Sequence, residues 1–234
     1  MCIVPSDMDP SGSQRNDVRA STSEPAGASD VTHALGAKIR EERLRANLSL
    51  RALASRTGLS PSLISAVERG RATPSVSSMA SMANALHLSL ADLFDDGERV
   101  APGAERRGAG TKDHRASVGK AGKYVLRPSE RMAIALQAGV TWERLTPEAE
   151  PDVDFLYSVY PVGSESCAED RLMSHTGREY GFVLGGVLGV QIGFEKFELH
   201  PSDSVALDSS QPHRLWAIGD EPARAIWLVL GRWR

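Results

Sequence analysis

The spacing of apolar residues changes near the middle of this chain of 234 residues. Between residues 33 and 94, large apolar side chains recur at the spacing of amphipathic helices. From residue 123 onward, short runs of alternating apolar and polar residues are broken by Gly, Pro and Asp, which predicts antiparallel β-structure. Helix faces and strand faces bury themselves in different ways, so we expect a multidomain chain, an α domain followed by an all-β domain.

Composition sets the limits of these domains. Residues 1–32 are rich in Ser, Asp, Gly, Ala and Pro, and they are predicted to form a disordered tail. Residues 95–122 are rich in Gly and charged residues, which is typical of a flexible linker. The predicted organisation is therefore a helical domain at 33–94 and a β domain at 123–234.

The two domains differ in charge. Residues 33–94 contain eight Lys or Arg and four Asp or Glu, whereas residues 123–234 contain eleven and sixteen. A basic surplus favours a polyanionic partner, because nucleic-acid binding begins with neutralisation of phosphates. An acidic domain is repelled by DNA, so we expect the helical domain alone to bind it.

Composition also argues against several protein classes. No apolar run approaches the roughly 18 residues of a membrane span, and no basic-then-apolar signal segment begins the chain. The chain has two cysteines, Cys2 and Cys167, which is too few for a disulfide framework. We expect a cytoplasmic protein with no membrane partner.

Serine residues divide the helical domain into short helices. A first helix contains Leu35 and Ile39, and Gly58 ends the second. Two short helices around the Gly58-Leu59 turn are the pattern of a helix-turn-helix. Five helices are predicted, the last four capped by Ser49, Ser60, Ser75 and Ser89.

Two charged residues fall on the inner faces of these helices. Arg43 lies four residues after Ile39, and Glu68 lies four residues after Ile64. A buried charge needs a partner, so the spacing predicts an ion pair between Arg43 and Glu68. The alternative is that both side chains lie at the rim of the core and reach water.

Residues 35–94, including LRALASRTGLSPSLISAVERGRATPS, resemble the XRE-type helix-turn-helix of phage repressors and bacterial regulators. The resemblance implies a five-helix, lambda-repressor-like domain that contains the Arg43–Glu68 pair. It also implies a recognition helix that begins at Ser60 and lies in the major groove. The residues that it places towards bases are Pro61, Ser62, Ser65 and Ala66, and those that it places near phosphates are Ser49, Arg51, Arg69 and Arg71.

The recognition helix departs from the family pattern in one respect. It has no long amide side chain of the kind that reads adenine with two hydrogen bonds. Ser62 and Ser65 are short, so weak direct readout is expected, and Arg51 is a candidate for contact with guanine. The alternative is that residues 60–65 only form a solvated helix face.

The β domain contains about ten short strand candidates, which predicts a closed or double-layered structure. The first candidate is Lys123–Leu126 and the last is Ala223–Leu230. The segments SHTGREYGFVLGGVLGVQIG and LHPSDSVALDSSQPHRLWAIGDEPARAIWLV resemble the two motifs of the cupin family. The resemblance implies a small jelly-roll β-barrel.

In cupins these motifs supply metal ligands. The resemblance implies that three of these ligands are His175, Glu179 and His213. Met173 stands where the family has another histidine, so one ligand of four is missing. Two histidines and a carboxylate suit one divalent transition metal, Fe, Mn, Ni or Zn. The alternatives are an organic effector in the same pocket or a purely structural His213. Candidate lining aromatics are Tyr157, Tyr160 and Trp216.

These features together predict a sequence-specific DNA-binding transcriptional regulator that is not an enzyme. We expect a homodimer that reads an inverted repeat in double-stranded DNA, and a cupin domain that binds a small-molecule or metal effector. The alternative is a mononuclear non-haem iron cupin oxygenase with a vestigial helix-turn-helix. The basic surplus and the helix caps of the recognition segment favour the regulator.

Overall fold

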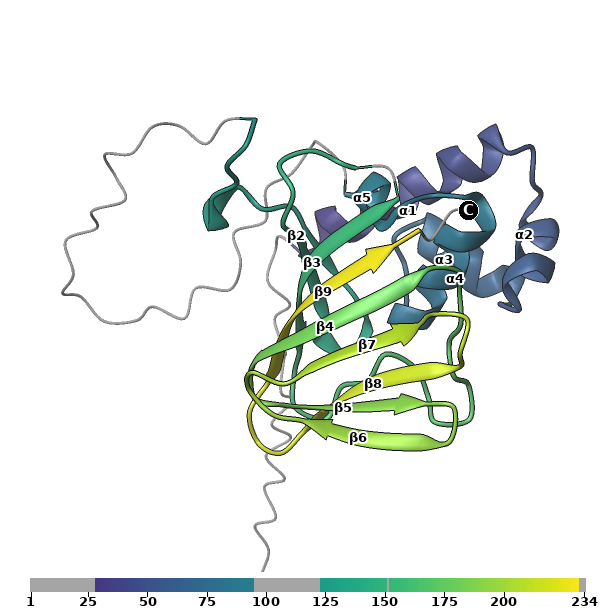
Figure 1. The fold of residues 1–234 in the computed structure, drawn as a ribbon. Helices are drawn as coiled ribbons and strands as arrows, with labels where there is room; N and C mark the ends of the chain where they lie inside the picture. Colours follow the sequence, from purple (N-terminus) through teal and green to yellow (C-terminus); the bar gives the residue numbers. More distant parts are fainter. Residues whose placement is uncertain (1–27, 95–122, 151, 232–234) are drawn as a thin grey trace, which may run out of the picture.

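A computed structural model describes residues 28–94, 123–150 and 152–231 (Figure 1). A helical N-terminal domain lies against a C-terminal domain built of β-strands. The predicted linker 95–122 and residues 1–27 of the predicted tail lie outside the described residues. No described helix is both long enough and apolar enough to cross a membrane.

The helical domain holds four helices of at least eight residues and a fifth single turn. Their bounds are α1 Ala28–Arg45, α2 Leu50–Thr57, α3 Pro61–Glu68, α4 Val76–Leu86 and α5 Leu90–Leu93. The expected fifth helix is thus only one turn long. Helix α1 begins inside the segment predicted as a tail, because Ser and Asp favour the first turn of a helix as well as disordered segments.

All four predicted serine caps are confirmed. The hydroxyl groups of Ser49, Ser60, Ser75 and Ser89 each accept a hydrogen bond from the backbone N–H three residues further on. Gly58 ends α2 with a φ of 69°, in the left-handed region that favours glycine. The turn from α2 to α3 is therefore fixed by local side-chain and backbone chemistry.

The β domain consists of two antiparallel sheets (Figure 1). The larger has the order β1-β2-β3-β9-β4-β7, and the smaller has the order β6-β5-β8. The bounds are β1 Ala133–Ala135, β2 Thr141–Arg144, β3 Val153–Tyr160, β4 Arg178–Gly185, β5 Val187–Ile192, β6 Glu195–Leu199, β7 Ser204–Asp208, β8 His213–Ile218 and β9 Ala223–Leu230.

Two expectations for this domain need correction. The two sheets do not join into one hydrogen-bonded ladder in the described residues, so a closed barrel is not confirmed. The strand predicted at 123–126 is wrong, because this segment is a turn followed by irregular chain. It leads into a short 3₁₀ helix, Pro128–Glu130, whose proline removes a donor that a strand ladder would need.

Alternation along the central strands decides which side chains enter the core. On β9 every second residue is buried, and on β4 the buried positions begin with Glu179. Trp227 on β9 lies opposite Gly181 on β4. A Cβ atom on Gly181 would lie 2.1 Å from the indole of Trp227, so only glycine leaves room for this ring. The ring consequently lies flat over β4, next to Glu179.

Arg43 and Glu68 form a buried two-pronged ion pair between α1 and α3. Nε of Arg43 donates to one carboxylate oxygen at 2.6 Å, and Nη2 donates to the other at 2.8 Å. Nη1 donates to the carbonyl oxygen of Leu48 at 2.8 Å. The hydrogen bond with Glu68 raises the pKa of Arg43 although burial opposes the charge. Gly36 permits this close approach of the helices, because a Cβ there would lie 2.2 Å from the carbonyl oxygen of Val67.

Removal of either partner should destabilise the helical domain. We expect Arg43→Ala or Glu68→Ala to cost about 3–5 kcal/mol, because each leaves a buried charge unpaired. Replacement of both by apolar residues of similar volume should cost much less. Urea unfolding followed by circular dichroism measures this. Arg45→Ala, which removes only exposed ion pairs, is the control. Single variants as stable as this control would contradict the prediction.

Candidate ligand site and DNA-contacting surface

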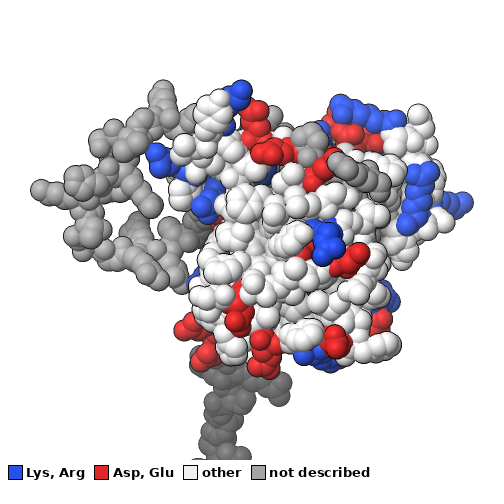
Figure 2. Space-filling model, in the orientation of Figure 1, with Lys and Arg blue, Asp and Glu red and all other residues white. Residues whose placement is uncertain are grey.

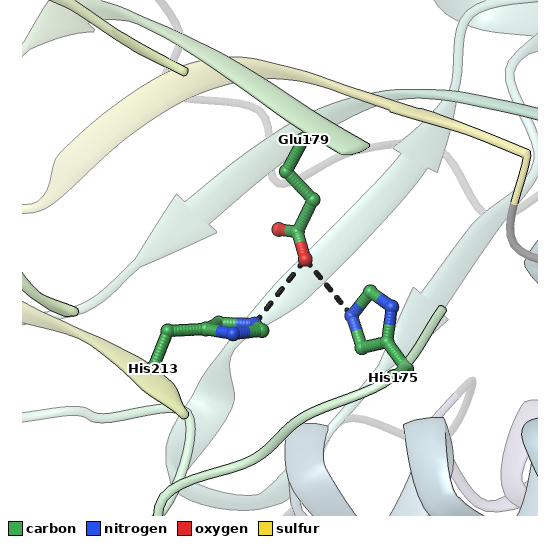
Figure 3. Close-up of side chains that lie close together, drawn as sticks. All are labelled: His175, Glu179 and His213. Carbon is green, nitrogen blue, oxygen red and sulfur yellow. Dashed lines mark ion pairs between the residues drawn. The ribbon is translucent and has the colours of Figure 1, made fainter. Parts of the chain in front are cut away.

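His175, Glu179 and His213 lie together between the two sheets (Figure 3). His175 lies on the loop before β4, Glu179 is near the start of β4, and His213 begins β8. Oε1 of Glu179 lies 2.9 Å from Nε2 of His175 and 3.2 Å from Nε2 of His213. The structure therefore brings together the three residues that the cupin resemblance selected.

Backbone geometry makes this convergence possible. Gly177 has a φ of 106°, which L side chains rarely adopt, and it bends the chain between His175 and Glu179. A β-bridge joins Met173 to His213, with N–H to O distances of 3.0 and 2.8 Å between their backbones. Met173 therefore lies beside His213, and its side chain helps to line the same cavity.

The indole of Trp227 holds the Glu179 side chain in place. Its Nε1–H donates to Oε2, which leaves Oε1 directed at the two histidines. Burial disfavours the charged carboxylate, but the contacts with His175 and His213 outweigh burial and hold the pKa of Glu179 well below its usual range. Glu179 is therefore a buried anion.

The other ring nitrogen of each histidine faces a backbone carbonyl. Nδ1 of His175 lies 3.0 Å from the carbonyl oxygen of Thr176, and Nδ1 of His213 lies 2.8 Å from that of Gln211. A carbonyl oxygen only accepts, so in each neutral ring Nδ1 carries the proton and Nε2 presents a lone pair. With a proton on Nε2, a ring donates to Oε1 of Glu179, and this contact lowers the pKa of the carboxyl group. With a neutral ring, the Nε2 lone pair is available to a cation instead, and the donor set fits a divalent transition metal.

The cluster borders a small cavity of about 30 Å³. Tyr160, one of the predicted lining aromatics, is fully buried against the cavity, and burial raises its pKa. Tyr157 and Trp216, the other two, do not line it. The remaining lining residues are Val76, Ala80, Trp142, Leu156, Ser158, Leu215, Trp227 and Val229.

The residues expected to contact DNA lie at the surface of the helical domain. Ser49, Arg51, Ser60, Pro61, Ser62, Arg69 and Arg71 are exposed, and Ser65 and Ala66 are half-buried. Arg69 donates to the hydroxyl of Ser65. The hydroxyls of Ser60 and Ser62 lie 3.0 Å apart. The start of α3 therefore presents short polar side chains to solvent, flanked by arginines.

Comparison with known proteins agrees with this architecture. Residues 34–94 match the family described as a helix-turn-helix domain, and residues 157–229 match the cupin domain family. The HTH-type transcriptional regulator PuuR of Escherichia coli (strain K12) is 24% identical over 187 residues, which cover 79% of this chain and 88% of PuuR. The chain is a helix-turn-helix transcriptional regulator with a cupin domain.

Solved structures extend the comparison to the fold. An HTH_3 family transcriptional regulator from Vibrio cholerae has a TM-score of 0.61 and 19% identity, covering 87% of this regulator and 98% of that chain. The two proteins therefore share a fold. Hydroxypropylphosphonic acid epoxidase from S. wedmorenis also aligns, with 18% identity and coverage of 85% and 98%. Its TM-score of 0.38 is too low to support any inference about activity.

Sequence reasoning missed two groups of site residues in this regulator. Trp227 was assigned to a strand without a role, although a buried indole N–H usually needs an acceptor and Glu179 is its acceptor here. Val76 and Ala80 belong to the fourth helix of the helical domain, yet they line the cavity of the β domain. Helical periodicity shows which face is buried and does not show which domain covers it.

Proposed function

We propose that this regulator binds operator DNA as a homodimer through α3, and that its cupin domain binds an effector in the cavity beside His175, Glu179 and His213. The observation that carries the proposal is the exposed start of α3, flanked by Arg51, Arg69 and Arg71, on the more basic of the two domains. DNA binding places the protein in the cytoplasm. The two sheets with a cavity between them support a jelly-roll barrel as the effector domain.

Base readout through α3 is expected to be limited. The Ser65 hydroxyl already accepts from Arg69, and only Pro61 and Ser62 are exposed in the first turn of the helix. Ser62 is short and can act as donor or acceptor, so it discriminates weakly between bases. Phosphate contacts by the arginines then supply most of the affinity, and DNA shape supplies part of the specificity.

Loss of one arginine should weaken binding to all DNA sequences alike. We expect Arg69→Ala or Arg71→Ala to reduce the slope of log K against log salt by about 1, because one phosphate contact is lost. Ser62→Ala should change the ranking of sites instead. Fluorescence anisotropy with several duplexes at different salt concentrations measures both effects. Lys196→Ala, on β6 of the other domain, is the control. An arginine variant with an unchanged slope would show that this arginine does not contact a DNA phosphate.

The three-residue cluster supports a divalent transition metal as part of the effector site. His175, Glu179 and His213 would hold the ion, which would supply positive charge and open positions for a small ligand. Met173 near the cluster offers a soft thioether where the cupin pattern has a histidine. We propose that the site senses its ligand and does not catalyse a reaction. Its cavity of about 30 Å³ has room for roughly two waters and none for an organic substrate. Iron-dependent oxygen consumption would favour the oxygenase instead.

Metal binding should depend on both histidines and on pH. The low pKa of Glu179 keeps its carboxylate charged in weak acid, so protons compete with the metal only at the histidines. Affinity should therefore fall as the pH is lowered, because a histidine must be neutral to bind a metal. Equilibrium dialysis of Co²⁺ against untagged protein measures this.

A His175→Ala/His213→Ala variant should lose this binding, and His200→Ala, an exposed histidine before β7, should keep it. Equal and low metal content in all three proteins would show that this cluster does not hold a metal.

The outer face of the larger sheet supports a homodimer. Tyr180, Phe182 and Leu184 point outward from β4 with 40, 43 and 49% of their surface exposed. The register places Leu228 beside Tyr180 and Ile226 beside Phe182. Figure 2 shows a largely uncharged face over β9, β4 and β7. An apolar patch of this extent on a monomer usually marks an interaction site.

The size of this face suits a second copy of the chain. The four neighbouring strands β3, β9, β4 and β7, of up to eight residues each, span about 19 by 26 Å, or roughly 500 Å². Two copies would bury roughly 1,000 Å² in total, the lower bound for a specific interface. A two-fold dimer would also place two α3 helices on one operator, as an inverted repeat requires.

A charge on this face should separate the dimer. We expect Phe182→Asp to give a monomer by light scattering, because two carboxylates would be buried against apolar surface. Phe194→Asp is the matched control, since Phe194 lies fully exposed on the turn after β5. A Phe182→Asp protein with the molar mass of a dimer would assign self-association to another surface.

A further inference from the structure

Helix α4 of the DNA-binding domain is buried on two sides. Its sequence, VSSMASMANAL, contains no Lys, Arg, Asp or Glu. Met79, Met82 and Ala83 are completely buried, and Val76 and Ala80 are also buried at 2% and 6% exposure. A surface helix normally carries charge on its outer face, so a helix without charge indicates neighbours on both sides.

The second neighbour of α4 is the ligand cavity itself. Val76 and Ala80 are four residues apart, so they lie on one face of the helix. Both line the cavity that His175 and Glu179 border from the cupin side. Figure 3 shows helices of the N-terminal domain beside the cluster. The DNA-binding domain thus completes the wall of the cavity.

We propose that α4 is part of the ligand site, so that occupancy of the cavity changes how the DNA-binding domain seats on the cupin domain. This inference rests on the proposed effector role of the cavity. The ligand class is a compact one, a divalent cation with one or two ligands the size of water, because about 30 Å³ admits little more. A larger occupant enters only if α4 moves away.

The contact between the domains is suited to such movement. Two backbone hydrogen bonds cross it in the described residues, from Ser77 to the carbonyl of Ser166 at 3.1 Å and from Gln137 to that of Pro74 at 2.9 Å. Beside α4 lies a second, polar cavity of about 620 Å³ that reaches the turn between α2 and α3. Its serine-rich wall leaves this side of the interface loosely packed. Separation of α4 therefore breaks few backbone hydrogen bonds, and it exposes the apolar side chains of Val76 and Ala80, so the bound state must compensate for that loss.

A substitution at Ala80 tests the position of α4. Ala80→Leu adds three carbon atoms to a cavity with room for about two waters, so α4 should no longer seat. Trp142 and Trp227 line the same cavity and are 6% and 5% exposed. Their emission should shift to longer wavelength and become more accessible to acrylamide. Asn84→Leu, which introduces the same side chain one turn further along α4 at an exposed position, should leave both properties unchanged.

The second measurement tests the coupling, with Co²⁺ as the probe and operator DNA as the reporter. In the wild type, saturating Co²⁺ should change DNA affinity by about fivefold or more, the usual range of coupling between two sites. In Ala80→Leu, DNA affinity without metal should persist, which shows a folded helical domain, and the response to Co²⁺ should fall below twofold. A variant with wild-type quenching and a wild-type response would overturn the role of α4.

Failure of the proposed function gives a different result. If Co²⁺ does not bind the wild type, the metal part of the proposed function fails while the quenching result still decides whether α4 closes the cavity. If Co²⁺ binds at the histidines but leaves DNA affinity unchanged, the metal site stands and the coupling through α4 is wrong.

Discussion

The burial of α4 between two domains is the constraint on which the arrangement of this regulator depends. One face of the helix packs with the core of the DNA-binding domain, and Val76 and Ala80 on another face close the cavity of the cupin domain. A helix shared in this way cannot carry charge, and its small residues allow close approach. The cavity of the cupin domain and the core of the DNA-binding domain therefore share one helix, which connects the two domains directly.

The buried carboxylates of Glu68 and Glu179 are stabilised in different ways. The difference distinguishes a structural ion pair from the candidate ligand site. Both oxygens of Glu68 receive well-directed donors from Arg43, so this charge is satisfied within the protein. Glu179 has one oxygen held by Trp227 and the other facing two histidine nitrogens that present lone pairs. The first arrangement fixes a helix pair. The second can bind a proton or a cation, which is the property expected of the proposed ligand site.

The sequence was sufficient for local features and insufficient for contacts between distant segments. Serine caps and Gly58 follow from chemistry within a few residues, and strands such as β3 and β9 follow from alternation. The Lys123–Leu126 strand failed because alternation in a short segment does not guarantee a partner strand. Gly181 and Trp227 are 46 positions apart, and only the register of β4 with β9 shows why one must be small. The contact of α4 with the cupin domain likewise depends on tertiary structure, and the local sequence does not show it.

The loss of one cupin ligand has a consequence for sensing. A sensor responds only if its ligand distinguishes two states of the protein and leaves when its concentration falls. A site with two histidines and one carboxylate binds a cation less tightly than a four-ligand site, and Met173 contributes a soft donor that hard cations disfavour. A ligand can shift the position of α4 only by its difference in affinity for the two states, so modest cation affinity suits a reversible response. The proposed three-ligand site is therefore consistent with the proposed role of α4.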